Sequence, residues 1–288
     1  MNIKLPKARL PRFAVILSFA VCVVMAIFIF SVRFGVWGKV PEKKEVSNFQ
    51  YQRASEVYSS DSVLIGKYYL FDRQPITYEE FPKHLLNALV AIEDQRYYKH
   101  SGIDYPSLFR VALKTILMQD QSSGGGSTLT QQLAKNLYPR KNRKKANMAV
   151  NKVKEMIIAS RLEDIYTKEE ILTHYLNTVS FGGNTFGIES ASLKFFNKKA
   201  KLLSIEEAAI LVGMLKATYG YNPKVFPKKS LNRRNLGLQS MYKNEFIRIE
   251  EKDSLMANPL RLNYKDFKHT AGICLLYTSD AADDVSTV

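Results

Sequence analysis

The sequence predicts a mainly α-helical domain that follows one N-terminal transmembrane helix and begins with a small β-hairpin. Three observations predict this fold class: an uncharged apolar run near the N-terminus, helical spacing of apolar residues after Thr77, and one convincing hairpin signal before that point. The 288 residues are 46% hydrophobic and 24% charged. This composition excludes a disordered chain and suits one large domain or two modest ones.

The apolar run covers residues 13–32 and contains no charged side chain. At about 1.5 Å per helical residue it spans roughly the 30 Å hydrocarbon core of a bilayer. Four cations and no acidic residue precede it: Lys4, Lys7, Arg9 and Arg12. The positive-inside rule therefore predicts a cytoplasmic segment at 1–12 and a domain on the outer, periplasmic side of the inner (plasma) membrane. A cleaved signal peptide is the alternative, but its apolar part is usually only about 7 to 15 residues long.

The exported part divides by composition into a linker at 33–54, a domain at 55–245 and a second linker at 246–273. A hairpin is predicted from 55–58 and 63–69, which flank a turn-like Ser-Ser-Asp-Ser segment. Helix starts of the capping-box type follow. They pair Thr77 with Glu80, Thr128 with Gln131, Thr167 with Glu170, and Ser204 with Glu207.

The clearest amphipathic helix begins near Lys168, because apolar residues recur on one of its faces. That face comprises Ile171, Leu172, Tyr175, Leu176 and Val179. Residues 274–288 differ from everything before them, since the basic bias ends and small residues with three aspartates appear. We interpret this stretch as a non-native tail, and we expect the native chain to continue past residue 273.

The net charge of +15 favours an acidic partner, which could be nucleic acid, an anionic membrane surface or a phosphate-bearing substrate. Export to the outer face argues against nucleic acid. Only Cys22 and Cys274 are present, which excludes a disulfide framework and a Cys-rich metal site. The four histidines show no close metal-ligand pairing, so no metal site is predicted from the residues.

A first candidate site begins at Glu93, which follows the apolar residues of 85–92 and so lies where a buried helix emerges. Desolvation at such a position raises the pKa of a carboxyl group, as a general base working near neutral pH requires. Asp94 points about 100° away on the helix and is expected to make a hydrogen bond that fixes the turn. The alternative is an ordinary solvated acidic helix end.

A second candidate site is the glycine-rich stretch 124–126 and the capped helix after it. Unpaired N–H groups and the positive end of the helix dipole suit an anion such as a diphosphate. Thr128, Gln131 and Lys135 lie on one helix face at i, i+3 and i+7. The position of the lysine excludes a nucleotide P-loop. A flexible linker before an ordinary helix remains the alternative.

The stretch from Lys135 to Lys154, both ends included, contains eight basic residues and no acidic residue, and the run ends at Glu155. Lys152 and Glu155 share a helix face at i, i+3. A cationic patch that ends in one carboxylate suits a pyrophosphate leaving group, because positive charge meets the charge that develops in the transition state. Contact with anionic lipid headgroups is the competing account.

Together these segments closely resemble the family 51 peptidoglycan glycosyltransferases, the domain of monofunctional transglycosylases and class A penicillin-binding proteins. The resemblance runs from about Ser55 to Met241, with its motifs in the family's order. E-D-x-x-[FY]-x-x-H-x-G-x-D is matched at 93–104, G-G-S-T-[IL]-T-Q-Q-x-x-K-N at 125–136, the K-x-x-E of R-K-x-x-E at 152–155, K-x-x-I-L-x-x-Y-L-N at 168–177, and G-I-E-x-A-x-x-x-[FY]-F-x-K at 187–198.

The resemblance implies a lysozyme-like fold that polymerises lipid II, with inversion at MurNAc C1 and release of undecaprenyl pyrophosphate. It implies Glu93 and Glu155 as catalytic residues, no required cofactor, and a divalent cation (Mg or Mn) at the pyrophosphate in some members. The implied partners are lipid II, the growing glycan strand, the membrane and other cell-wall synthesis proteins. The implied substrate-binding residues are Asp94, Ser127, Thr128, Gln131, Gln132, Lys135, Asn136 and Lys152.

One departure concerns the donor site, because the family's Arg before Lys152 is Asn151 here. An Arg often found about four residues further upstream is also missing, with Asn147 nearest. Nearby cations at 143–145 could supply the charge, although Arg and Lys grip phosphate differently. No Lys-Thr-Gly motif occurs, and the Ser-x-x-Lys at 240–243 and the Ser-x-Asn at 230–232 both lie within the predicted glycosyltransferase domain at 55–245, so no transpeptidase half is present in this sequence. If the chain is a truncated class A penicillin-binding protein, that half would follow.

The apolar segment 103–118 is either a core helix or, as the resemblance implies, a region that dips toward the bilayer. Two rival functions remain. A lysozyme-like glycan-cleaving enzyme would use Glu93 as an acid and would not need Gln131, Lys135 and Lys152. A non-catalytic, membrane-tethered cell-wall scaffold is favoured only by Asn151.

Overall fold

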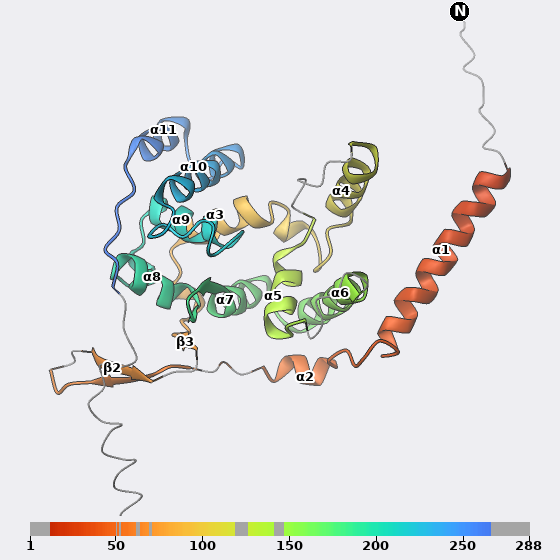
Figure 1. Cartoon of the computed structure of the whole chain (residues 1–288), viewed down its shortest axis with the longest axis horizontal. Helices are drawn as coiled ribbons and strands as arrows, with labels where there is room; N and C mark the ends of the chain where they lie inside the picture. The colour runs from red at the N-terminus through yellow and green to blue at the C-terminus, as the bar shows by residue number, and fades with distance from the viewer. Residues whose placement is uncertain are drawn as a thin grey trace, which may run out of the picture.

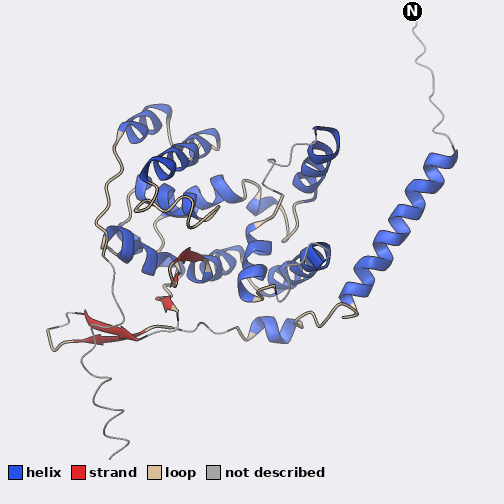
Figure 2. Cartoon of the chain, viewed as in Figure 1, coloured by secondary structure: helices blue, strands red, loops and turns tan. Residues whose placement is uncertain are grey.

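The computed structural model describes residues 12–49, 51, 53–61, 64–68, 71–118, 126–140 and 147–265 (Figure 1). Helices dominate these residues, and the strands are short (Figure 2). The helices are α1 Arg12–Arg33, α2 Lys43–Ser47, α3 Lys83–Glu93, α4 Tyr105–Met118, α5 Leu129–Leu137, α6 Met148–Ile165, α7 Lys168–Thr178, α8 Ile188–Phe196, α9 Ile205–Met214, α10 Pro227–Lys243 and α11 Ile249–Ala257. Short 3-10 turns occupy Tyr78–Glu80, Tyr97–Lys99 and Ala200–Leu202. The strands are β1 Ser55–Tyr58, β2 Leu64–Tyr68, β3 Asp72–Arg73, β4 Ser180–Gly182 and β5 Thr185–Phe186.

Helix α1 is the predicted membrane span. It is long and apolar enough to cross a membrane, judged by length and composition. Large apolar side chains along it are exposed, and it extends away from the helical body beside α6 (Figure 1). A helix that exposes apolar residues all around suits lipid rather than water. The predicted tail at 274–288 and the basic residues Lys4, Lys7 and Arg9 lie outside the described residues.

The predicted hairpin is confirmed, because β1 and β2 pair antiparallel with Ser55 opposite Tyr68. The structure also contains a second small sheet that the sequence did not predict. Its strand order is β3-β5-β4, with β3 parallel to β5 and β4 antiparallel to β5. Strands of two or three residues are too short to show the alternation of apolar and polar residues that identifies a strand.

Three of the four predicted capping boxes form both of their hydrogen bonds: Thr77 with Glu80, Thr167 with Glu170, and Ser204 with Glu207. The prediction for Thr128 and Gln131 is half wrong. The Thr128 hydroxyl accepts from the Gln131 backbone N–H, but the Gln131 side chain does not return to the Thr128 backbone. The Gln131 side-chain amide instead donates to the Gly102 carbonyl and accepts from Lys152.

The core lies around α9, whose residues from Ala208 to Met214 are buried between α3 and α10. A second set of contacts joins α5 to α6 and to α7. The predicted apolar face of α7 is buried, with the side chains of Ile171, Leu172 and Leu176 fully enclosed. The C-terminal end of α3 and the N-terminal end of α5 meet between these two sets of helices (Figure 1).

Residues 246–265, predicted as part of a linker, contain α11 and pack onto the domain. The buried Arg234 guanidinium donates to the carbonyl oxygens of Asn258 at 2.8 Å and Met256 at 3.1 Å. Further along, the Asn263 N–H donates to the Phe195 carbonyl at 3.1 Å. The domain's packed structure therefore continues well past Met241.

Candidate active site

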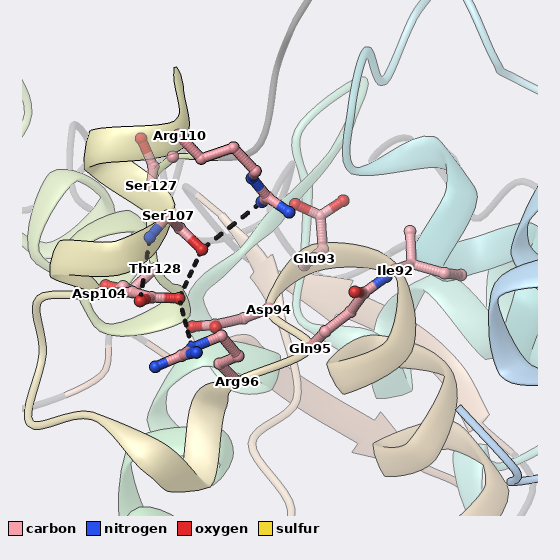
Figure 3. A pocket seen from close by; sticks show the side chains of 11 residues that line it. Ile92, Glu93, Asp94, Gln95, Arg96, Asp104, Ser107, Arg110, Ser127 and Thr128 are labelled. Carbon is pink, nitrogen blue, oxygen red and sulfur yellow. Dashed lines mark hydrogen bonds and ion pairs between the residues drawn. The ribbon is translucent and has the colours of Figure 1, made fainter. Parts of the chain in front are cut away.

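A cavity of about 200 Å³ lies where the end of α3, the start of α4 and the start of α5 meet. Most of its side chains are polar or charged (Figure 3). The lining residues are Ile92, Glu93, Asp94, Gln95, Arg96, Asp104, Ser107, Arg110, Gly126, Ser127 and Thr128. The first and second candidate sites of the sequence therefore contribute to one cavity. Gly124 and Gly125 lie outside the described residues.

Glu93 is the last residue of α3, and its side chain is 13% exposed. The buried apolar residues before it hold the helix in the core, so the carboxylate emerges at the cavity wall. Gln132 Nε2 donates to Glu93 Oε2 at 2.9 Å. Arg233 Nη2 lies 4.0 Å from Glu93 Oε1. One donor and one cation thus orient the carboxylate.

Behind this contact, the hydroxyl of Tyr175 donates to Gln132 Oε1 at 3.0 Å. Tyr175 is fully buried, and burial, followed by the nearby charge of Glu93, raises its pKa well above the usual value. The phenol therefore stays protonated and remains a donor. With its oxygen held by Tyr175, the Gln132 amide turns its NH₂ group toward Glu93.

Asp94 lines the cavity but is engaged by protein groups. Both of its carboxylate oxygens lie 3.1 Å from His100 Nε2, and Oδ2 also accepts from the Leu129 backbone N–H at 2.9 Å. Asp94 is the C-cap of α3 and Leu129 is the first residue of α5, so this carboxylate joins the two helices. Its contacts match the expectation of a hydrogen bond that fixes the turn.

Gly102 allows α5 and α6 to approach the loop that follows α3. Its φ is +82°, and a Cβ there would lie 3.0 Å from the backbone of Ala159 on α6. Its carbonyl accepts from Thr128 Oγ1 at 2.7 Å and from Gln131 Nε2 at 3.2 Å. A side chain at this position would push the loop away from α6 and disturb both contacts.

Lys152 on α6 binds the start of α5 from the other side. Its Nζ donates to Gln131 Oε1 at 2.6 Å and to Ser127 Oγ at 2.8 Å. Ser127 lines the cavity that Glu93 also lines, so the ammonium reaches the cavity's rim. Burial lowers the pKa of Lys152, and the charge of Glu155 opposes that effect.

Glu155 is buried, with a side chain 7% exposed, and two cations hold it. Arg140 Nε and Nη2 each lie 2.8 Å from Glu155 Oε1, and Lys152 Nζ lies 3.6 Å from Oε2. Lys135 is exposed on α5 and lies outside the cavity lining, although its charge is one of those that lower the pKa of Lys152. Asn136, half-buried on α5, also lies outside that lining.

Four residues near the site were not predicted as site residues: Arg110, Arg140, Tyr175 and Arg233. Arg110 extends into the cavity from α4, and Figure 3 shows its guanidinium on the side of Glu93. Tyr175 carried a usable signal, because a buried Tyr hydroxyl normally needs a polar partner. Arg140 carried a weak one as a member of the basic run at 135–154, whereas Arg110 and Arg233 carried none, since their position relative to Glu93 depends on how the helices pack.

Helix α4 presents an exposed apolar face. Tyr105, Phe109 and Leu113 recur at i, i+4 and i+8, with side chains 70%, 66% and 41% exposed. The helix stands apart from the helical body (Figure 1). Of the two alternatives for 103–118, a plain core helix does not account for this face.

The donor set near the cations fits a protein-bound metal poorly. Among the described residues, no group of three or more His, Cys, Asp or Glu side chains could hold an ion. Glu155, the carboxylate closest to Lys152, is already held by Arg140.

A carboxylate at the cavity wall and an ammonium that reaches the cavity's rim through Ser127 suit one class of enzyme, a transferase that activates a hydroxyl while it holds a phosphate-bearing group. The family described as Transglycosylase matches residues 61–242. The chain belongs to that family, and its enzyme class is therefore that of a glycosyltransferase.

Known relatives agree with this assignment. Penicillin-binding protein 1A of Vibrio cholerae is 36% identical over 245 residues, which cover 85% of this chain and 29% of the relative. The Aquifex aeolicus protein of the same name is 33% identical over 83% of this chain and 32% of its own length. Penicillin-binding protein 1F of Bacillus subtilis is 35% identical over 75% of this chain and 30% of its own length. The chain spans about three-tenths of the length of these relatives.

A crystal structure of penicillin-binding protein 1A from Haemophilus influenzae aligns with a TM-score of 0.44 at 21% identity. The alignment covers 82% of this chain and 24% of that one. The similarity is too low to add to the assignment.

Proposed function

We propose that this chain is the membrane-anchored peptidoglycan glycosyltransferase part of a class A penicillin-binding protein, polymerising lipid II into glycan strands at the outer membrane face. One observation carries the proposal: the Glu93 carboxylate and the Ser127 hydroxyl that binds Lys152 line the same cavity. A reaction that deprotonates an alcohol and expels a diphosphate needs both groups at one site.

In the proposed reaction, Glu93 accepts the proton of the acceptor's GlcNAc 4-hydroxyl. The oxygen attacks C1 of the donor's MurNAc, and the bond between C1 and the pyrophosphate oxygen breaks with its electron pair going to the leaving group. Attack from the face opposite the leaving group inverts the configuration at C1. The cations stabilise the negative charge of the undecaprenyl pyrophosphate as it leaves.

Gln132 and Tyr175 orient the base, and Asp94 holds the α3 end against α5. Ser127, Thr128, Gln131 and Lys152 form the donor-side wall, and Glu155 keeps Lys152 and Arg140 together. Lys135 and Asn136, one turn further along α5, would contact the more distant part of the donor. The proposed orientation, with the domain on the outer side, rests on the basic residues before the apolar run.

The test uses the full chain in detergent with labelled lipid II. We expect the parent to form polymer and Glu93→Gln to lose roughly 10²- to 10⁴-fold in rate, the usual contribution of a general base. Glu250→Gln, which changes an exposed carboxylate on α11, is the matched control and should keep the parent rate. Thermal unfolding of both variants checks that they fold.

Polymerisation at the parent rate by Glu93→Gln would overturn the proposed mechanism. A parent that makes no polymer but degrades preformed glycan would identify a glycan-cleaving enzyme. A folded parent with neither activity would support a membrane-tethered cell-wall scaffold.

A further inference from the structure

The carboxylate of Glu155 has an unusual source of positive charge. On a helix, a cation four residues before a carboxylate reaches it across one turn. That position on α6 is Asn151, and the guanidinium comes instead from Arg140, which lies three residues past the end of α5 at Leu137. The two partners are 15 residues apart in sequence, so the contact joins the α5–α6 connection to α6.

Arg140 uses one edge of its guanidinium on Glu155. Nε and Nη2 both point at Oε1, at 2.8 Å each. A guanidinium carries five N–H donors in a planar fork, so three donors remain on the other edges. The Arg140 side chain is 32% exposed, whereas that of Glu155 is only 7% exposed. The Arg140 side chain is therefore partly open to a ligand, whereas the carboxylate that it contacts is almost completely buried.

The cluster also holds more positive than negative charge. Glu155 bridges Arg140 and Lys152, and Lys135 is close enough for its charge to act on Lys152. Three cations against one carboxylate leave an excess of two positive charges. The Lys152 side chain, which is 30% exposed, is partly withdrawn from water, and an excess of like charge there is costly unless an anion balances it. A diphosphate carries charge of the matching size and sign.

We propose that Arg140 is a diphosphate-binding residue of the donor site in this chain, supplying from the α5–α6 connection the guanidinium that α6 lacks at Asn151. This inference rests on the proposed function. One edge of Arg140 fixes Glu155, and the free edge binds phosphate oxygens of the donor beside Lys152. Paired N–H donors of this kind match a phosphate group better than an ammonium does.

The test measures binding of inorganic pyrophosphate to the full chain in detergent, alongside lipid II polymerisation. We expect Arg140→Ala to weaken pyrophosphate binding by about 10- to 100-fold, the equivalent of one or two charge-assisted hydrogen bonds. Arg140→Lys should fall between parent and alanine. Adding Asn151→Arg to Arg140→Ala should restore binding to within about 3-fold, because an arginine at i, i+4 can reach Glu155 from α6.

The control is Arg248→Ala, which removes an exposed arginine at the start of α11 and should leave pyrophosphate binding unchanged. A purely structural Arg140 would give a lower melting temperature with normal pyrophosphate binding below it, and that result overturns the inference. If Arg140→Ala does not fold, Arg140→Lys decides, since pyrophosphate binding equal to the parent would overturn the inference as well. If the parent polymerises lipid II and Arg140→Ala matches it in both pyrophosphate binding and polymerisation, only the role of Arg140 is refuted. If the parent does not polymerise lipid II, the proposed function is refuted.

Discussion

At the scale of single residues, Glu93 is held by a chain of side chains rather than by one partner. The buried Tyr175 hydroxyl donates to Gln132, and Gln132 donates to Glu93. A free glutamine amide can turn over and present either its oxygen or its nitrogen. Tyr175 removes that freedom, because its raised pKa keeps it a donor and it therefore selects the oxygen. The proposed base thus keeps a fixed direction before substrate binds.

Tyr175→Phe tests this series of hydrogen bonds with little change in side-chain shape. We expect the free energy of unfolding to fall by about 1 kcal/mol, because the amide oxygen of the half-buried Gln132 loses its donor. The polymerisation rate should fall by roughly 10-fold, since the base is no longer held in its reactive direction. Tyr219→Phe is the control, because the Tyr219 side chain is 72% exposed.

Chemical denaturation and lipid II turnover measure the two effects separately. A loss of stability with an unchanged turnover rate would mean that Tyr175 supports only the core. Gln132→Glu would place a second carboxylate beside Glu93, so it serves as a further check on the same contact.

The sequence predicted the types of residue at the site better than their contacts. Glu93 and Lys152 were identified because a carboxylate after a buried helix and a cation in an acid-free run are local patterns. The second partner of Gln131 and the Arg140–Glu155 contact depend on how α5 and α6 pack. No local spacing carries that information, because residues 15 apart that do not share one helix have no fixed geometry.

At the scale of elements, the segment after α1 is attached to α6 and α7 rather than hanging free. Lys154 Nζ donates to the Trp37 carbonyl at 2.8 Å, and the Tyr166 hydroxyl donates to the Val46 carbonyl at 3.1 Å. Val46 is fully buried in the core. The residues that join the candidate membrane span to the domain therefore lie along α6, the helix that carries Lys152 and Glu155.

Just beyond α2, this segment ends in an aromatic group around His174 on α7. The ring of His174 lies 4.7 Å from that of Tyr166, 5.7 Å from Tyr51 and 6.4 Å from Phe49. Burial lowers the pKa of His174, and only the charge of Glu170 opposes it. Burial also raises the pKa of Tyr51, which hydrogen-bonds His174 Nδ1, so neither neighbouring tyrosine is charged near neutral pH.

This arrangement predicts that acid loosens the segment. The folded-state pKa of His174 lies below the ordinary value of about 6.5, so the unfolded state binds the proton first as pH falls. Stability that is present above about pH 6.5 is therefore lost as the pH falls from that value toward the lowered pKa. Limited proteolysis of the 35–49 segment at pH 7.5 and pH 5.0 measures this loss of stability, and we expect faster cleavage at the lower pH.

His174→Gln is the comparison, because it removes the titrating group. The ratio of cleavage rates between the two pH values should be smaller in His174→Gln than in the parent. An equal ratio in both proteins would assign the acid effect to other groups.

Long elements could be predicted from the sequence, whereas very short ones could not. Helix α7 was predicted to begin near Lys168, and it does, because Thr167 and Glu170 form a complete capping box before a long amphipathic run. Strands β3 and β5 consist of two residues each and exist only because 72–73 and 185–186 are brought together by the surrounding helices. Such contacts between distant segments leave no periodic signal in the chain.

At the scale of the whole molecule, two of the described helices, α1 and α4, expose apolar side chains on successive turns. Helix α1 exposes large apolar side chains along its length, and α4 exposes Tyr105, Phe109 and Leu113 on one face. Contiguous exposed apolar surface of this kind is uncommon on soluble domains and usually marks a membrane or protein contact. The net charge of +15 suits the anionic surface of a membrane. Both features agree with an enzyme whose proposed substrate is embedded in lipid.

A substitution in α4 separates membrane contact from folding. Phe109→Glu places a charge on a side chain that is 66% exposed, so we expect an unchanged melting temperature in detergent. In vesicles that contain lipid II and anionic phospholipid, we expect turnover to fall by roughly 10-fold, because a carboxylate resists both burial in the bilayer and approach to its negative surface. Phe109→Leu keeps the apolar face and should retain most of the vesicle activity. Since every variant keeps the candidate membrane span α1, a loss confined to Phe109→Glu in vesicles would come from α4 itself, whereas full vesicle activity in that variant would mean that α4 does not touch the membrane during turnover.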